Sequence, residues 1–157
     1  NFDIKMRYAT FRQKHFYYKF NLQSKNHPHW NGTRVCIKKY LKSPQWLRDL
    51  KFKKRPFWRL DKFRLNNIIS DGGWHFCNLK TPEDLLYKYK NLCETNDPIH
   101  FKERIDPKYL QIDEIQKKVI SGEDIIGRKD NFEKIELDYS FPEYLIKNKE
   151  NYRDWII

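Results

Sequence analysis

The segment Asp71-Gly72-Gly73-Trp74-His75-Phe76 has the residue types best suited to forming a binding or catalytic site. Its two consecutive glycines allow backbone conformations closed to other residues, and they let the backbone come close to a ligand. An aromatic ring, an imidazole and a second aromatic ring follow at once. The alternative is structural: the glycines form a tight turn before a buried strand, and the histidine is a hydrogen-bonded member of the core.

A helix is predicted directly after this segment, from Pro82 to about Cys93. Thr81 is a favourable N-cap, Pro82 suits the first helical position, and the acidic pair Glu83 and Asp84 complements the positive end of the helix. Apolar residues then recur at helical spacing, which predicts one buried stripe. The stripe consists of Leu85, Leu86, Tyr89 and Leu92.

A dense aromatic run over residues 15–21 predicts a strand. In this strand Phe16, Tyr18 and Phe20 share one face, and the other face carries His15, Tyr17, Lys19 and Asn21. One of the two faces is expected to join the core, and the other can line a cleft. Further elements are predicted at five places: a strand over 33–41, a helix over 44–50, a helix over 107–120 that Gly122 ends, a strand over 132–137 and a helix from Pro142.

The chain has 157 residues, enough for a single domain with its own core. It opens on Asn1 without a start methionine, signal peptide or membrane-spanning run, so we interpret it as a segment of a longer protein. Its three cysteines are widely spaced and predict free thiols in a reducing compartment, with neither a disulfide framework nor a zinc site.

Positive charge is concentrated in the first half of the chain. The net charge is +11; residues 1–80 hold 19 Lys and Arg against 4 Asp and Glu, and residues 81–157 hold 13 against 17. This asymmetry predicts an anionic partner for the first half, or else a solvated basic face. Residues 51–64 interleave basic and aromatic side chains, a pattern typical of single-stranded nucleic-acid binding. His27 and His29 are expected to be exposed to solvent.

Several stretches, in order along nearly the whole chain, resemble glycosyltransferase family 17, whose members include β-1,4-mannosyl-glycoprotein 4-β-N-acetylglucosaminyltransferases. The most distinctive of them is Gly73-Trp74-His75-Phe76. The remaining stretches are less specific one by one, and the resemblance depends on their colinearity. They are Phe16–Asn21, Trp30–Arg34, Leu47-Arg48, Lys88–Leu92, Gly122–Asp124 with Arg128, and Phe141–Leu145.

The resemblance implies a GT-A-like α/β glycosyltransferase, with this chain as the C-terminal, acceptor-side part of a mixed sheet flanked by helices. It would transfer an N-acetylglucosamine-like sugar from a nucleotide-sugar (UDP-sugar) donor to a glycan acceptor, with inversion at the anomeric carbon. It implies a hexosyltransferase that needs the N-terminal donor-binding half of the same protein. A cytoplasmic location, extending to the inner membrane surface, is expected, with no nucleic-acid partner and no integral membrane segment. The rival hypothesis is a basic module that binds single-stranded nucleic acid.

Sugar transfer needs charge neutralisation at the leaving diphosphate, a carboxylate base for the acceptor hydroxyl, and rings that stack on sugars. By analogy with GT-A enzymes, His75 is the candidate ligand of a divalent metal (Mn or Mg) or of the diphosphate. Glu94 or Asp71 is the candidate base, and the sequence does not choose between them. The candidate substrate-binding residues are Gly72, Gly73, Trp74, Arg48, Arg128, Tyr18, Asn21 and Trp30.

Three departures from the family pattern matter. Position 77 is Cys77 where the family usually has serine, and Glu94 stands where the family has a histidine. The family's Asp-x-Asp element would lie upstream of Asn1. It is expected to bind the nucleotide diphosphate and to supply most of the protein ligands of the divalent metal. The resemblance therefore predicts that the chain does not turn over the donor by itself.

Overall fold

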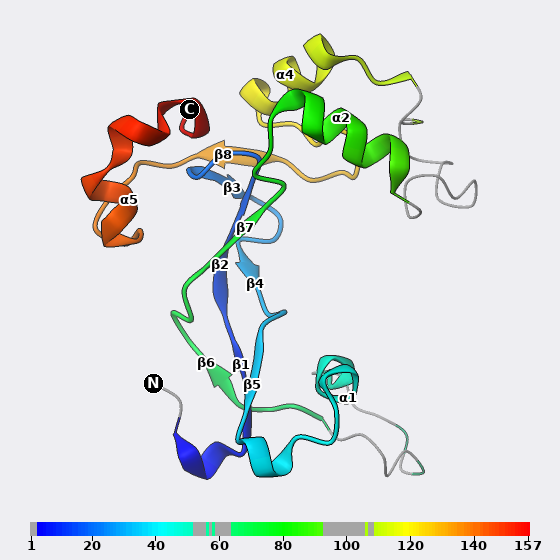
Figure 1. The fold of residues 1–157 in the computed structure, drawn as a ribbon, viewed down its shortest axis with the longest axis vertical. Helices are drawn as coiled ribbons and strands as arrows, with labels where there is room; N and C mark the ends of the chain where they lie inside the picture. The colour runs from blue at the N-terminus through cyan, green and yellow to red at the C-terminus, as the bar shows by residue number, and fades with distance from the viewer. Residues whose placement is uncertain (1–2, 52–55, 57, 59–63, 93–105, 107–108) are drawn as a thin grey trace. The chain divides into compact units, whose positions relative to one another are not determined.

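Two β-sheets and several short helices make up the chain in the computed structural model (Figure 1). The structure describes residues 3–51, 56, 58, 64–92, 106 and 109–157. Contacts divide the chain into two compact units, which are described separately. The first unit is residues 1–14 and 29–73, and the second unit is residues 15–28 and 74–157. The predicted α/β class is confirmed at this level.

The first unit contains a three-stranded sheet of order β5-β1-β6. Strand β1 is central, antiparallel to β5 and parallel to β6. The short strand β4 pairs instead with Gln13 and Lys14, the first residues of β2. In chain order the elements of this unit are η1 (Ile4–Met6), β1 (Tyr8–Phe11), β4 (His29–Trp30), β5 (Arg34–Cys36), η2 (Lys38–Tyr40), α1 (Pro44–Asp49) and β6 (Ile68–Ile69).

The paired glycines form a bend at the end of the first unit. Asp71 and Gly73 both have positive φ, +52° and +99° respectively, and glycine adopts such a conformation without a steric penalty. A Cβ on Gly72 would lie 2.5 Å from the Cβ of Phe11. The glycines therefore allow the bend and a close contact with strand β1, so the close approach seen in the structure is to the protein's own chain.

The second unit holds the larger share of the helices and a sheet around strand β2. Strand β2 pairs with β3 in antiparallel fashion, β3 pairs with β8 in the same fashion, and β7 lies on the other side of β2. The elements of this unit are β2 (Gln13–Tyr17, beginning in the first unit), β3 (Leu22–Ser24), β7 (Trp74–Cys77), α2 (Pro82–Asn91), α4 (Ile112–Ser121), β8 (Phe132–Lys134), α5 (Glu143–Lys147) and the 3-10 helix η5 (Lys149–Trp155).

Two groups of buried side chains stabilise the second unit. The larger group packs helices α2 and α4 side by side against the sheet, with Leu85 and Ile115 almost inaccessible to solvent (Figure 1). The smaller group is centred on Phe16, which is 0% exposed, and packs strands β2 and β7 against Phe141 and Leu145 near α5. Burial of each large apolar side chain contributes roughly 1.5–3 kcal/mol.

The helix boundaries follow the local signals where those signals are strong. Helix α2 begins as predicted, and the Thr81 hydroxyl accepts a hydrogen bond from the Asp84 backbone N–H at 3.2 Å. Helix α1 matches its prediction, and α4 ends at Gly122 in the left-handed conformation as predicted. The predicted start of α4 at residue 107 is wrong, because the helix begins at Ile112.

Two strands are shorter than predicted. The strand predicted over 15–21 ends at Tyr17, because Tyr18 takes a positive φ of +63° and its hydroxyl donates to Asp124 at 3.1 Å. The predicted common face of Phe16, Tyr18 and Phe20 is therefore wrong. The strand predicted over 33–41 covers only Arg34–Cys36, and β8 ends at Lys134.

The helix predicted from Pro142 is broken into two pieces. Helix α5 ends at Lys147, and the 3-10 helix η5 that follows contains Tyr152 with non-helical dihedral angles. Across the described ranges, none of the helices combines the length and apolar character that crossing a membrane requires.

Candidate functional site

The register of β2 against β7 brings the candidate site together. The backbone N–H of Lys14 donates to the Gly73 carbonyl and that of Tyr18 to the Cys77 carbonyl, both at 2.9 Å. Residue numbers rise together in these two bonds, so the strands run parallel. His15 then lies opposite His75. Because successive side chains in a strand point to opposite faces, residues 15, 17, 75 and 77 share one face.

The opposite face of the same pair is aromatic. Phe16 and Phe76 have ring centroids 5.4 Å apart, and Phe16 also packs on Phe141 at 5.2 Å. Trp74 belongs to this face, and its indole N–H donates to the Ser140 carbonyl at 3.0 Å. Trp74 and Phe76 therefore face the apolar cluster, and His75 faces the opposite side of the strand.

Two imidazoles and a thiol gather on the polar face of the pair. The ring nitrogens of His15 and His75 and the sulfur of Cys77 lie within 4.8 Å of one another. The two imidazole centroids are 5.2 Å apart. His15 is 4% exposed, whereas His75 and Cys77 are half-buried. A ligand can therefore reach this group from the side of β7.

A backbone contact fixes the orientation of His15. Its Nδ1 lies 3.1 Å from the carbonyl oxygen of His27, which can only accept a hydrogen bond. Nδ1 therefore carries the proton, and Nε2 carries the lone pair. The His15 ring also packs against the Tyr17 ring in a tilted arrangement, with centroids 4.6 Å apart.

Burial keeps these groups uncharged. Desolvation lowers the pKa of His15, and it lowers the pKa of His75 as well. Burial raises the pKa of the Cys77 thiol, against the opposing effect of the nearby Lys88 and Arg128 cations. Burial also raises the pKa of Tyr17 to about 12, with a contribution from its hydrogen bond with Cys77. At neutral pH the site is thus two neutral imidazoles beside a thiol and a phenol.

One of the cations near the site, Arg128, is already paired. The guanidinium of Arg128 lies 5.6 Å from the Tyr17 ring centre and forms two hydrogen bonds to Oδ2 of Asp124, at 3.0 and 2.7 Å. Asp124 is 5% exposed and also accepts from Tyr18 and from two backbone N–H groups. Arg128 therefore neutralises a buried carboxylate, which weakens its candidacy as a ligand of a diphosphate.

The predicted site residues are divided between the two units. Asp71, Gly72, Gly73, Arg48 and Trp30 belong to the first unit. There Asp71 is exposed in the bend before β7, and Arg48 is exposed on helix α1. Trp30 is 41% exposed and its indole lies against Gly32.

The remaining predicted residues belong to the second unit, except that Glu94 lies outside the described residues. His75 is on strand β7, close to the side chains of His15 and Cys77. Trp74 faces the opposite side of the strand. Tyr18 and Asn21 are almost completely buried, and their polar groups hydrogen-bond within the protein.

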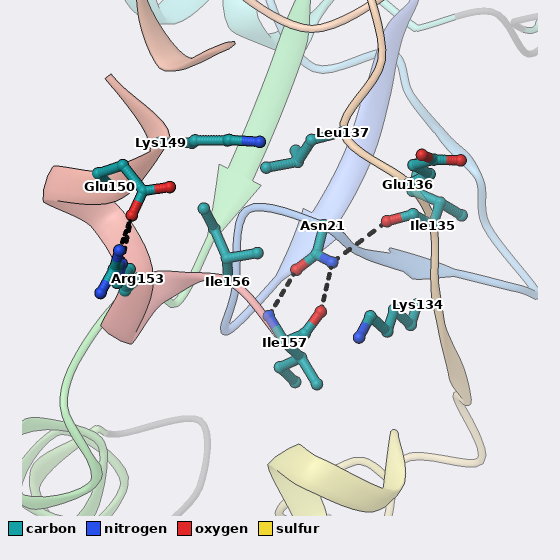
Figure 2. A pocket seen from close by; sticks show the side chains of 10 residues that line it. All are labelled: Asn21, Lys134, Ile135, Glu136, Leu137, Lys149, Glu150, Arg153, Ile156 and Ile157. Atoms are coloured by element: carbon teal, nitrogen blue, oxygen red, sulfur yellow. Dashed lines mark hydrogen bonds and ion pairs between the residues drawn. The ribbon is translucent and has the colours of Figure 1, made fainter. Parts of the chain in front are cut away.

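Asn21 lies at the wall of a pocket of about 630 Å³ (Figure 2). Its amide nitrogen donates to the carbonyl of Ile135 at 3.1 Å and to that of Ile157 at 2.8 Å. Its oxygen accepts from the Ile157 N–H at 2.9 Å. Asn21 thus joins Ile157 to the segment after β8. The charged residues that line the pocket are Lys134, Glu136, Lys149, Glu150 and Arg153.

Sequence reasoning named His75 but not its partners. His15 and Tyr17 were predicted to share a face of their strand, which is a partial signal. Cys77 was treated only as a departure from the family pattern. What the sequence lacks is a local indication that residues 15–17 and 75–77 are adjacent, because pairing of parallel strands so far apart leaves no short-range pattern.

The donor set does not suit the Mn or Mg ion that the family resemblance implies. Those ions prefer carboxylate, carbonyl and water oxygens, whereas imidazole and thiolate ligands suit zinc and related ions. His75 therefore lies among groups that fit a different class of metal. Comparisons with protein-family models, curated proteins and solved structures found no match to this chain.

Proposed function

We propose that the chain is the acceptor-side part of a GT-A-like, inverting glycosyltransferase of family 17. The observation that supports this most directly is the environment of the most distinctive stretch of the resemblance, Gly73-Trp74-His75-Phe76. Its histidine is half-buried on a polar face beside His15 and Cys77, and the aromatic residues beside it occupy the opposite face.

In this proposal His75 contacts the leaving diphosphate of the nucleotide sugar. Its lowered pKa keeps it neutral at pH 7, so its ring N–H donates a hydrogen bond to the phosphate oxygen on which negative charge develops. The carboxylate base is Glu94 or Asp71. The Mn or Mg ion belongs to residues of the upstream half, since the donors around His75 do not suit it.

Transfer of N-acetylglucosamine from UDP-N-acetylglucosamine to a mannose-containing glycan tests the proposal. Two proteins are compared: the chain itself, and the chain with its upstream coding sequence restored. We expect transfer only in the longer protein. His75→Ala in that protein should lower kcat/KM about 100-fold or more, the typical cost of removing one hydrogen-bond donor to developing charge. His27→Ala, an exposed histidine, is the control.

Two outcomes contradict the proposal. Transfer by the chain alone would show that no upstream half is needed. Full activity of the His75→Ala protein would remove His75 from the reaction and leave a non-catalytic role in glycan binding for this chain.

A second function, binding of single-stranded nucleic acid, is favoured by one observation. The first unit holds 16 Lys and Arg against 4 Asp and Glu, a net charge of +12, whereas the second holds 16 against 17, a net charge of −1. The whole excess of positive charge thus belongs to one unit. Binding of a single-stranded oligonucleotide whose affinity falls steeply with salt concentration would support this function, and weak binding with a shallow salt dependence would exclude it.

A further inference from the structure

We propose that His15, His75 and Cys77 form a binding site for a divalent metal ion of the zinc class. The inference does not depend on the glycosyltransferase proposal, because it uses only the donor atoms and the strand pairing. It also goes against the cysteine spacing, which by itself predicts no zinc site in this chain.

The distances are close to those that a shared ion requires. Zinc binds imidazole nitrogen at about 2.0–2.1 Å and thiolate sulfur at about 2.3 Å, so two donors of one tetrahedral ion lie roughly 3.5 Å apart. The three donors already lie within 4.8 Å of one another. Small rotations of the His75 and Cys77 side chains, which are half-buried, bring them to a common centre.

The backbone holds the ligands in place before an ion arrives. All three side chains stand on the paired strands β2 and β7, whose opposite face is anchored by the packing of Phe16 on Phe76. The His27 carbonyl orients the His15 ring through Nδ1, which leaves Nε2 as the nitrogen able to bind the ion. A hydrogen bond from the second ring nitrogen to a carbonyl oxygen is the usual support of a metal-binding histidine.

The charges around the site are compatible with a cation. The charge of Arg128 is neutralised by Asp124, 2.7 Å away. Lys88 donates to the neutral Asn78 side-chain oxygen and keeps its positive charge, which favours the thiolate form of Cys77. On binding, the Cys77 sulfur–hydrogen bond breaks, a sulfur–metal bond forms and one proton leaves to solvent. Two neutral imidazoles and one thiolate leave the bound ion with a net charge of +1. Three protein ligands also leave a fourth position for water, as in catalytic zinc sites.

Titration of the metal-free chain with cobalt chloride tests the site. Cobalt(II) takes tetrahedral zinc sites, and a thiolate ligand gives it a charge-transfer absorption in the near ultraviolet. We expect one equivalent of cobalt to bind with this absorption and with strong visible bands, and zinc chloride to displace it. Magnesium and manganese chloride should not compete, because the site offers no oxygen ligands of the kind they prefer.

Matched variants separate this site from adventitious binding. Cys77→Ser should abolish the charge-transfer absorption and weaken zinc binding about 100-fold or more, since even loss of a supporting hydrogen bond typically costs 10–100-fold. His75→Gln should weaken binding to a similar degree. A chain with Cys36→Ser and Cys93→Ser should keep the absorption unchanged, and so should His29→Gln, which removes an exposed imidazole.

Circular dichroism establishes that each variant is folded before its affinity is compared. The proposal is overturned if folded Cys77→Ser retains the cobalt spectrum, if the double serine variant or His29→Gln loses it, or if zinc binds the parent and folded Cys77→Ser chains equally tightly.

Discussion

The two faces of the β2–β7 pair are made from alternate residues of the same strands, yet they differ in almost every physical respect. One face is a cluster of rings in which Phe16 is fully buried between Phe76 and Phe141. The other face carries His15, His75 and Cys77, whose burial costs free energy because polar groups leave water. The comparison teaches that the aromatic face fixes the register, and that the register then positions the polar face.

The largest effect is expected on the aromatic face. Phe16→Ala should lower the free energy of unfolding by about 3–5 kcal/mol, because it removes a fully buried ring and leaves a cavity. Urea denaturation measures this change. The control is Tyr139→Ala, which removes a 96% exposed ring and should change stability by less than about 0.5 kcal/mol. Equal losses in the two variants would show that Phe16 does not anchor the pair.

The next largest effect on the free energy of unfolding is expected for the Asp124–Arg128 ion pair near the polar face. Asp124→Asn should destabilise the chain by about 2 kcal/mol, because it leaves the partly buried Arg128 guanidinium without its counter-ion. Glu143→Gln breaks a pair with Lys147 whose side chains are 80% and 70% exposed, and it should cost less than about 0.5 kcal/mol. Urea denaturation of both variants gives the comparison, and a cost for Asp124→Asn no greater than that of Glu143→Gln would contradict it.

Acidification should lower the free energy of unfolding, because His15 and His75 on the polar face take up protons more readily in the unfolded chain. Burial lowers the pKa of His15 and of His75 below the ordinary value of 6.5, so the unfolded chain binds protons more readily than the folded chain. The free energy of unfolding therefore falls as pH drops from about 6.5 toward the lower folded pKa values. Urea denaturation in metal-free buffer between pH 7.5 and 5 measures this decline. The slope should be smaller in His15→Gln; an identical slope would exclude His15 as its source.

The smallest effect is expected for Tyr17→Phe, which removes one hydroxyl from the polar face. The Tyr17 hydroxyl hydrogen-bonds with Cys77 and lowers the pKa of that thiol, so its loss should raise the thiol pKa. The pH midpoint of Cys77 labelling by a thiol reagent would then move upward, in a Cys36→Ser and Cys93→Ser background. Stability should change by only about 1 kcal/mol. A midpoint that stays still or moves downward would show that this hydrogen bond does not favour the thiolate.

Short-range signals predicted the parts of the fold that depend on neighbours in the chain. Thr81 and Pro82 gave the start of helix α2, and Gly122 gave the end of α4, because caps and breakers act within a few residues. The glycines before Trp74 likewise predicted the bend, although the close contact they permit is with Phe11.

The features that the sequence did not predict depend on contacts between residues that are far apart in the chain. Tyr18 leaves the strand conformation while its hydroxyl reaches Asp124, 106 positions later in the sequence. The grouping of His15 with His75 and Cys77 follows from strand pairing across some sixty residues, which no periodic pattern records. The local sequence thus indicated His75 as a candidate site residue, but it did not indicate the residues that lie beside it.

The parallel pairing of β2 with β7 has a consequence for how this chain tolerates change. The polypeptide leaves β2 after Tyr17 and returns beside it at Trp74, so residues 18–73 form one long excursion between two adjacent strands. The entropy cost of closing an excursion grows slowly, by about 0.6 kcal/mol for each doubling of its length. Insertions at exposed connections within it, such as Leu41-Lys42, should therefore be inexpensive, whereas insertions in its strands or at buried residues such as Tyr18 should not.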